Sequence, residues 1–428
     1  MSLPRPGAGM DVLCSKAAAL TLVAVFAAFP VSVALANSLM ALTLLLLLPR
    51  VFRHGTRCVD ASILKNPVAW PVFCLAAYIL LAATWSPAEW IDIGGYFKKY
   101  LKFLLLPIFI TLLFEKKTRV LCWKAFALAM LFTLVSTWLN VWISIPWSRT
   151  DNQGFGVDHT VFKDYISQGI MMAFFVCLCA YWAIRAHSRK AAVGWWLVAA
   201  LGAASILFLS AGRTGYLSLL FSTLVFGIFF VGARIKKVLG ILVGALAVLT
   251  VAFLVSPQFQ HRSMQAWEEA RSSSLSTVTS VGARVEVWRF VVKNSSERSL
   301  LGAGTASYPV LAQNYFKDPQ FCATVCPHPH NQFLLFFFEL GLVGLVLFFW
   351  LLFVIVRQAF RYPRAHRALM LSFVAVLVTS NMTHSSFWLS TESHFFILMM
   401  ALLMASAGSR RAVQSPGAAA DAPAQSPP

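Results

Sequence analysis

Charged side chains are scarce in this sequence. Only 12% of its 428 residues are charged and 59% are hydrophobic, a balance that excludes the usual soluble globular classes. An internal repeat and a glycine-rich nucleotide-binding loop are both missing. We therefore interpret the chain as an all-α polytopic membrane protein whose outer surface faces lipid.

Acidic residues are especially few, with 16 against 35 lysines and arginines. The resulting net charge of +19 would suit a nucleic-acid partner if the basic residues formed one patch. They fall instead in short clusters between apolar runs, which is typical of cytoplasmic loops. The charge therefore indicates membrane topology, and no nucleic-acid partner is expected.

Apolar runs near membrane-spanning length predict about twelve transmembrane helices. They lie near residues 17–30, 32–49, 66–84, 99–114, 120–143, 163–184, 191–209, 214–231, 236–255, 331–356, 365–381 and 393–407. The first two runs are short and meet at Pro30, so we expect a hairpin there. The alternative for the first segment is a signal peptide cleaved after Ala34-Leu35-Ala36, which would leave the later topology unchanged.

With the N-terminus inside, the basic clusters all fall on one side of the membrane, which the positive-inside rule identifies as cytoplasmic. Residues 1–16 and the Pro/Ala/Ser-rich tail 408–428 are then both cytoplasmic, and the tail is predicted to be disordered. The clusters are Arg50, Arg53, Arg57 and Lys65; Lys116, Lys117 and Arg119; Arg185, Arg189 and Lys190; Arg234, Lys236 and Lys237; Arg357, Arg361, Arg364 and Arg367; Arg410 and Arg411.

Residues 256–330 form by far the longest outer loop, between the helices of residues 17–255 and those of residues 331–407. Its apolar residues at helical spacing predict an amphipathic helix on or beside the membrane. They are Val281, Val285, Trp288 and Val292. We expect this loop to hold the polar chemistry.

The loop ends in Cys326-Pro327-His328-Pro329-His330-Asn331-Gln332. Its prolines disfavour helix before His330, so we expect His330 at the turn where the next helix begins. Imidazole takes or gives a proton near neutral pH, which makes His330 the candidate general base. His328 and Asn331 beside it are candidate substrate contacts.

Cys322 and Cys326 with His328 and His330 form a Cys-x3-Cys-x-His-x-His run. A disulfide on an oxidising outer face is our first interpretation, with free thiols and a zinc site as alternatives. A zinc ligand cannot also act as a base, so the zinc and general-base hypotheses for His330 exclude each other.

Three arginines are candidate anion ligands. Arg213 begins a predicted helix after Ser210-Ala211-Gly212, where backbone N–H groups and the helix dipole favour an anion. Arg284 and Arg289 lie about 140° apart around the amphipathic helix, so they are not expected to hold the same phosphate, and Arg284 is the preferred ligand. The alternatives are an interfacial arginine at 213 and a solvated helix face at 284 and 289.

Other residues of the predicted outer loops indicate a function less specifically. Lys98 and Lys99 at the outer end of the fourth predicted helix suit substrate binding or head-group anchoring equally well. His384 and His394, near the ends of the last two helices, are interpreted as structural or interfacial. The outer aspartates at positions 92, 151, 158, 164 and 318 are scattered, so neither a metal nor another cofactor is expected.

Three short motifs carry a resemblance to a known family. They are His330-Asn331 followed after nine residues by Gly341 and then Gly344; Arg213 with Leu217; and Gly282-Ala283-Arg284 with Trp288 ahead of Leu301-Gly302-Ala303-Gly304. In these motifs and in the order of its predicted transmembrane helices, the stretch 17–407 resembles the bacterial O-antigen ligases of the O-antigen ligase and polymerase superfamily.

The resemblance implies a fold similar to the GT-C glycosyltransferases and a site on the periplasmic face of the inner membrane. It implies inverting, metal-independent transfer of polysaccharide from undecaprenyl pyrophosphate to a sugar hydroxyl of lipid A core. His330 would deprotonate the acceptor, and Arg213 and Arg284 would hold the pyrophosphate. The alternatives are an O-antigen polymerase, a protein O-oligosaccharyltransferase, or a lipid or ion transporter, although a transporter would place its charges near mid-helix.

Overall fold

A computed structural model of the chain describes residues 8–54, 61–64, 66–232, 234–271, 280–295 and 299–408. Every regular element in these ranges is a helix, and several are long and apolar enough to cross a membrane. The prediction of an all-α polytopic membrane protein is therefore confirmed. Of the predicted features, Arg57, Lys65 and the tail after residue 408 lie outside the described residues.

Within the described residues, seven helices reach membrane-spanning length and hydropathy. They are α7 (Lys116–Leu139), α8 (Tyr165–Ile184), α9 (Arg189–Leu209), α10 (Arg213–Val231), α11 (Ile235–Val255), α16 (Gln332–Ala359) and α17 (Arg364–Thr383). Shorter apolar stretches lie in α1 (Ala8–Ala28), α2 (Val33–His54), α4 (Ala69–Ala82) with η2 (Ala83–Trp85), and α18 (Ser390–Gly408). α1 and α2 are separate helices on either side of Pro30, so the predicted hairpin is confirmed.

The span predicted at residues 99–114 lies largely within two consecutive helices. These 11-residue helices, α5 (Trp90–Tyr100) and α6 (Lys102–Leu112), meet at Leu101. Neither is long enough to cross the hydrocarbon core alone. Because α5 is amphipathic, it buries Ile93, Tyr96 and Tyr100 on one face and exposes its polar face.

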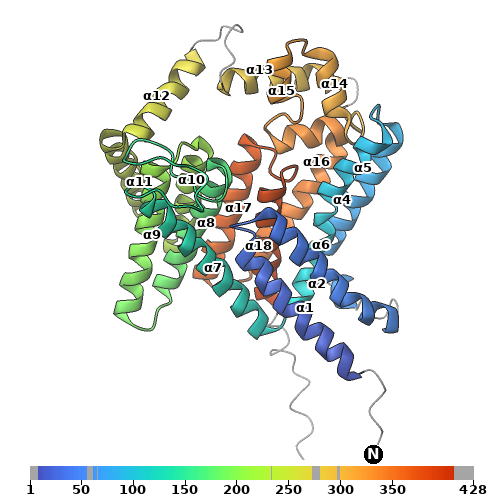
Figure 1. Ribbon diagram of the computed structural model, residues 1–428, viewed down its shortest axis with the longest axis horizontal. Coiled ribbons are helices and arrows are strands. Elements are labelled where there is room, and N and C mark those ends of the chain that lie inside the picture. Colours follow the sequence, from blue (N-terminus) through green and yellow to red (C-terminus); the bar gives the residue numbers. More distant parts are fainter. Residues whose placement is uncertain are drawn as a thin grey trace, which may run out of the picture.

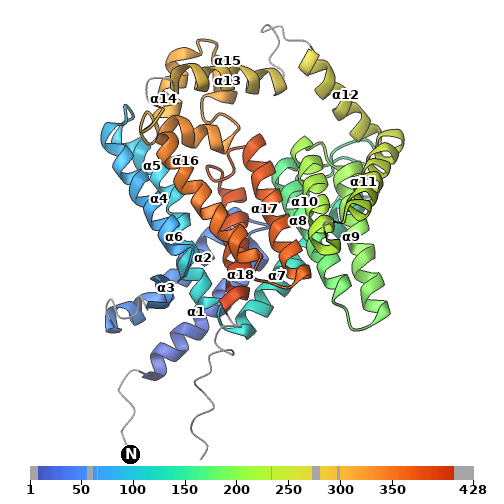
Figure 2. The same cartoon turned by 180° about the vertical axis from the view of Figure 1, so that it is seen from behind.

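The helices form two groups around a central pair. In Figures 1 and 2, α17 and α18 lie between a group that contains α8–α11 and a group that contains α4–α6. Buried aromatic rings pack where α7, α8, α17 and α18 meet; they are Phe126, Phe174, Phe373 and Phe395. The helices α12–α15 lie at the end of the bundle opposite the N-terminus (Figure 1).

The described parts of segment 256–330, which leave out residues 272–279 and 296–298, contain four helices where one was predicted: α12 (Pro257–Arg271), α13 (Ser280–Ser295), α14 (Ser307–Tyr315) and α15 (Pro319–Val325). The predicted amphipathic helix is present as α13, and the protein itself covers apolar side chains other than those of the predicted stripe. Val285 and Val292 are exposed, whereas Val287 and Phe290 are buried. The reason is that α13 packs against α14, α15 and the start of α16, with the ring of Phe290 5.5 Å from that of Phe338.

The helix predicted at residues 331–356 is present as α16, but it is interrupted at Gly341, where φ is 64°. The segment before α14 fills the break with backbone hydrogen bonds. The N–H of Ala303 donates to the C=O of Phe338, and the N–H of Leu342 donates to the C=O of Ser299, both at 2.8 Å. This junction ties the helices α13, α14 and α15 to the bundle of long apolar helices.

Replacement of Gly302 tests this junction. Gly302 has a φ of 78°, and a Cβ there would lie 2.4 Å from the carbonyl oxygen of Glu339. We expect Gly302→Ala to destabilise the protein by about 2 kcal/mol or more, seen as a lower thermal unfolding temperature in detergent. Gly95→Ala is the control, because nothing lies within 4 Å of a Cβ at that position in α5. Equal unfolding temperatures for the two variants would contradict this account.

Candidate active site

His330 lies at the turn directly before α16, as predicted. The helix begins at Gln332, and the side chain of Asn331 caps it by accepting the N–H of Leu334 at 3.1 Å. The backbone of His330 has a φ of 51°, in the left-handed region that residues other than glycine rarely adopt. Such strained positions concentrate at functional sites, where the surrounding structure holds them in place.

The tautomer of His330 follows from its hydrogen bond. Its Nε2 lies 3.2 Å from the carbonyl oxygen of Thr324 in α15. Because a carbonyl only accepts, Nε2 carries the proton and Nδ1 keeps its lone pair. Burial, and then the charge of His384, lowers the pKa of His330 to about 4. The imidazole is therefore neutral at pH 7.

His384, interpreted from the sequence as structural or interfacial, belongs to the same cluster. Its ring stacks on that of His330 at a centroid distance of 5.7 Å, and its Nδ1 donates to Oε1 of Glu392 at 2.8 Å. Burial opposes the charged form, but Glu392 prevails and raises the pKa of His384. The feature of the sequence that could have indicated this pair is a histidine and a glutamate at the two ends of the loop between the last two helices.

The loop between α17 and α18 reaches His330 through Gln332. The side-chain oxygen of Gln332 accepts the backbone N–H groups of Phe387 at 3.0 Å and of Trp388 at 3.3 Å. This side chain is buried at the first residue of α16. The start of α16 therefore positions both His330 and the loop that carries His384.

Only one of the two candidate lysines adjoins the histidines. The Nζ of Lys99 lies 3.1 Å from the ring centroid of Trp388, which suits a cation–π contact. The Trp388 ring is in turn 4.7 Å from the ring of His328, which is buried. Lys98 is exposed. The structure therefore brings Lys99, but not Lys98, to the edge of the cluster.

Arg213, the first residue of α10, already holds an anion. Its Nη1 and Nη2 donate to the two carboxylate oxygens of Glu269 at 2.9 and 3.0 Å. Glu269 lies on α12 and also accepts the N–H of Val281 at 3.1 Å, which joins α12 to α13. The hydrogen bond from Arg213 lowers the pKa of Glu269. Sequence reasoning missed Glu269, because no local pattern connects residues 56 positions apart.

Arg284 and Arg289 have different surroundings, in line with their angular separation on α13. Arg284 is half-buried, and burial followed by the charge of Arg213 lowers its pKa. The charge of Arg284 also contributes to lowering the pKa of His330. The side chain of Arg289 is 64% exposed and lies 3.8 Å from Glu286. Arg284 therefore couples electrostatically to both Arg213 and the histidines, whereas Arg289 faces solvent.

Cys322 and Cys326 are joined by a disulfide bond at the end of α15. Their sulfur atoms are therefore not metal ligands, and the zinc hypothesis for the Cys-x3-Cys-x-His-x-His run is wrong for that ligand set. The bond holds the end of α15, where Thr324 binds His330.

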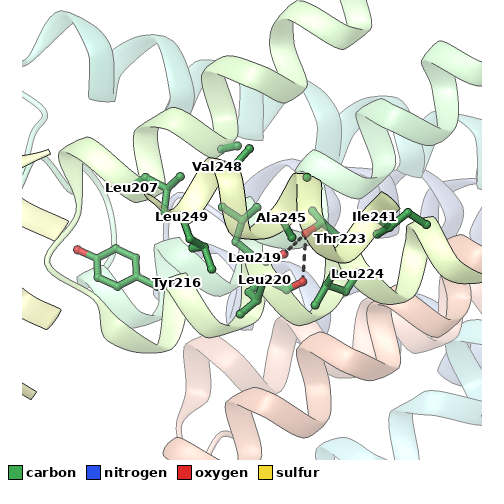
Figure 3. Close-up of a pocket in the computed structure, with 12 residues that line it drawn as sticks. Leu207, Tyr216, Leu219, Leu220, Thr223, Leu224, Ile241, Ala245, Val248 and Leu249 are labelled. Atoms are coloured by element: carbon green, nitrogen blue, oxygen red, sulfur yellow. Dashed lines mark hydrogen bonds between the residues drawn. The ribbon is translucent and has the colours of Figure 1, made fainter. Parts of the chain in front are cut away.

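A groove of about 290 Å³ runs along α10 between α9 and α11. Its lining is apolar except for Tyr216 and Thr223, and Tyr216 stands at one end (Figure 3). Tyr216 lies three residues after Arg213 on the same helix. An acyl or prenyl chain in this groove would therefore bring its head group close to Arg213.

Comparisons with known proteins agree with the family resemblance. Residues 197–349 match the O-antigen ligase family, a range that includes Arg213, Arg284 and His330. A protein of Rickettsia felis (strain ATCC VR-1525 / URRWXCal2) that carries the provisional name of a polysaccharide ligase is 23% identical over 189 residues. That match spans 41% of this chain and 45% of the relative.

Glu269 and an external anion compete for Arg213, so removing the carboxylate should strengthen anion binding. We expect Glu269→Gln to raise the affinity of the purified protein for inorganic pyrophosphate about tenfold, equivalent to about 1.4 kcal/mol, in isothermal titration calorimetry. Glu286→Gln is the matched control, because Glu286 pairs with the exposed Arg289 at 3.8 Å. Unchanged or weaker binding by Glu269→Gln would show that Glu269 orients Arg213 instead of competing for it.

Proposed function

From the O-antigen ligase domain that residues 197–349 carry, we propose that this protein is an O-antigen ligase. It transfers polysaccharide from undecaprenyl pyrophosphate to a sugar hydroxyl of lipid A core, on the periplasmic face of the bacterial inner membrane. The observation that carries the proposal is a neutral histidine, His330, with a free Nδ1 lone pair in the electrostatic field of Arg284.

In this reaction Nδ1 of His330 takes the proton of the acceptor hydroxyl. The hydroxyl oxygen bonds to the anomeric carbon of the donor, and the bond from that carbon to the pyrophosphate oxygen breaks with inversion. The pyrophosphate leaves with the electron pair. Burial, and then the nearby positive charges, keep the pKa of His330 low in the free protein, and a bound pyrophosphate offsets those charges. Donor binding therefore makes His330 a stronger base.

Arg213 and Arg284 neutralise the charge that develops on the leaving pyrophosphate. Guanidinium groups form bidentate, charge-assisted hydrogen bonds with phosphate oxygens, so the reaction needs no metal ion. Because Glu269 occupies Arg213 in the free protein, the donor must displace this carboxylate. The bond between Glu269 and α13 couples that displacement to the helix that bears Arg284.

The undecaprenyl chain of the donor lies in the apolar groove beside α10. Ala252 is the one buried residue in α11, so this side of the groove is exposed to the bilayer and a lipid can enter sideways. Lipid A core approaches from the outer surface, where Lys99 contacts its sugars or phosphates. His328 and Asn331, the other candidate substrate contacts, are buried in the free protein, where His328 accepts the backbone N–H of His330 and Asn331 caps α16. Arg289 and Lys98, both exposed, provide further contacts with phosphate or lipid head groups.

The acceptor is tested by incubating the purified protein with undecaprenyl-linked polymer and lipid A core in liposomes, with a chelator and without nucleotide. A ligase joins the polymer to lipid A core, since the pyrophosphate bond supplies the driving force. A polymerase lengthens the donor, and a protein oligosaccharyltransferase needs a polypeptide acceptor. Growth of polymer on the donor with none on lipid A core would overturn the ligase assignment.

The role of His330 generates a second test. We expect His330→Ala to lower the rate of transfer by about two to four orders of magnitude, because the variant lacks the imidazole that accepts the hydroxyl proton. Its thermal unfolding temperature should stay near that of the wild type. The control is His187→Ala, which removes an exposed imidazole in the turn between α8 and α9. Transfer by His330→Ala at the control rate would rule out this residue as the base.

A further inference from the structure

Three imidazoles converge in the candidate active site. Each of His328, His330 and His384 offers a ring nitrogen, and these atoms lie within 4.8 Å of one another. The ring of His328 is 4.3 Å from that of His330 and 5.5 Å from that of His384. His328 and His384 are buried, and His330 is partly buried. The cluster therefore combines loop residues from before α16 and after α17.

Hydrogen bonds already set two of these rings for metal binding. The Nδ1 proton of His384 points to Glu392 at 2.8 Å, and the Nε2 proton of His330 points to the carbonyl of Thr324 at 3.2 Å. Nδ1 of His330 consequently carries a lone pair, and Nε2 of His384 does so when that ring is neutral, so a metal ion competes there with a proton. Carboxylates and backbone carbonyls bind the outer nitrogen of metal-ligating histidines in the same way, fixing the tautomer and the ring orientation.

The third ring and the local charge also suit a cation. Nδ1 of His328 accepts the backbone N–H of His330 at 3.3 Å. This hydrogen bond is long, so a bond from Nδ1 to a metal ion can replace it. Glu392 is buried, and its Oε2 has no hydrogen-bond partner among the described residues. A cation held by His384 would offset this buried negative charge.

We propose that His328, His330 and His384 bind a divalent transition-metal ion of the zinc class. Imidazole nitrogens prefer zinc, copper and nickel to magnesium or calcium, and three of them leave one position of a tetrahedral site open. The bound ion inhibits the enzyme, because it occupies the Nδ1 lone pair that must accept the acceptor proton. The inhibition rests on the proposed function, whereas the binding does not.

Direct titration tests the binding. The full chain, purified with a chelator and then freed of it, is titrated with Zn²⁺ in a calorimeter and with Co²⁺ in a spectrophotometer. We expect one ion per chain at this site, with a Co²⁺ spectrum typical of nitrogen ligands. His384→Ala should abolish that binding, and the milder Glu392→Gln should weaken it about 10- to 100-fold. His261→Ala, which removes an exposed imidazole on α12, should bind as the wild type does.

Unfolding temperatures measured alongside show whether the buried variants remain folded. If His384→Ala does not fold, Glu392→Gln decides the outcome. If a folded His384→Ala or Glu392→Gln variant binds Zn²⁺ with unchanged affinity, the proposed metal site is wrong.

Transfer assays test the inhibition. Zn²⁺ should stop transfer with a midpoint equal to its binding constant, a chelator should restore it, and Mg²⁺ should have no effect. Stimulation by Zn²⁺, or full activity at saturation, would overturn the inhibitory role. If the ion binds and the variants respond as expected, but the metal-free protein transfers nothing to any acceptor, the proposed function fails and the metal site stands.

Discussion

A close backbone approach between the outer segment and α16 holds the site together. Gly302 and Gly341 both have positive φ, and a Cβ at Gly341 would lie 2.3 Å from the carbonyl oxygen of Leu300. The absence of side chains at these two residues lets the segments pair through their backbones. Thr305 extends the junction to α4, because its hydroxyl donates to the carbonyl of Ile79 at 2.6 Å.

This junction determines where the polar residues stand. It holds the start of α16 against α13, α14 and α15, so that His330 and Arg284 come from elements packed in one small core. Hydrogen bonds from Gln332 then add the loop that carries His384. Gly302 and Gly341, which belong to the motifs of the family resemblance, therefore have a structural role, because the two backbones touch at these positions. This role is separate from the chemistry of His330, which lies between them in the sequence.

Electrostatically, the part of the site around Arg213 and Arg284 is a cationic region that contains the carboxylate of Glu269. Arg213 and Arg284 lie within range of each other's charge, and Glu269 neutralises Arg213 from α12. A buried cation without a partner is costly, so an internal anion stabilises the free protein. An anionic substrate can take the place of that carboxylate. The positive charges of the site also contribute to the low pKa of His330, so added negative charge would raise that pKa.

Hydropathy by itself determined most of the membrane spans, because every backbone group in lipid must be satisfied within a helix. The prolines before His330 likewise determined its place at a helix start, and the turn before Arg213 determined the start of α10. These are local effects, which a sequence contains in full.

Other features depended on contacts between distant residues. The face of α13 that packs on α14, α15 and α16 was not predicted because these helices are distant in sequence, and the break of α16 at Gly341 arises where a separate segment fills it. Glu269 reached Arg213, and His384 with Glu392 reached His330, only through packing of elements far apart in the chain. Tertiary structure alone decided these features, because hydrophobic periodicity is local whereas charge pairing and backbone contact depend on distance in space.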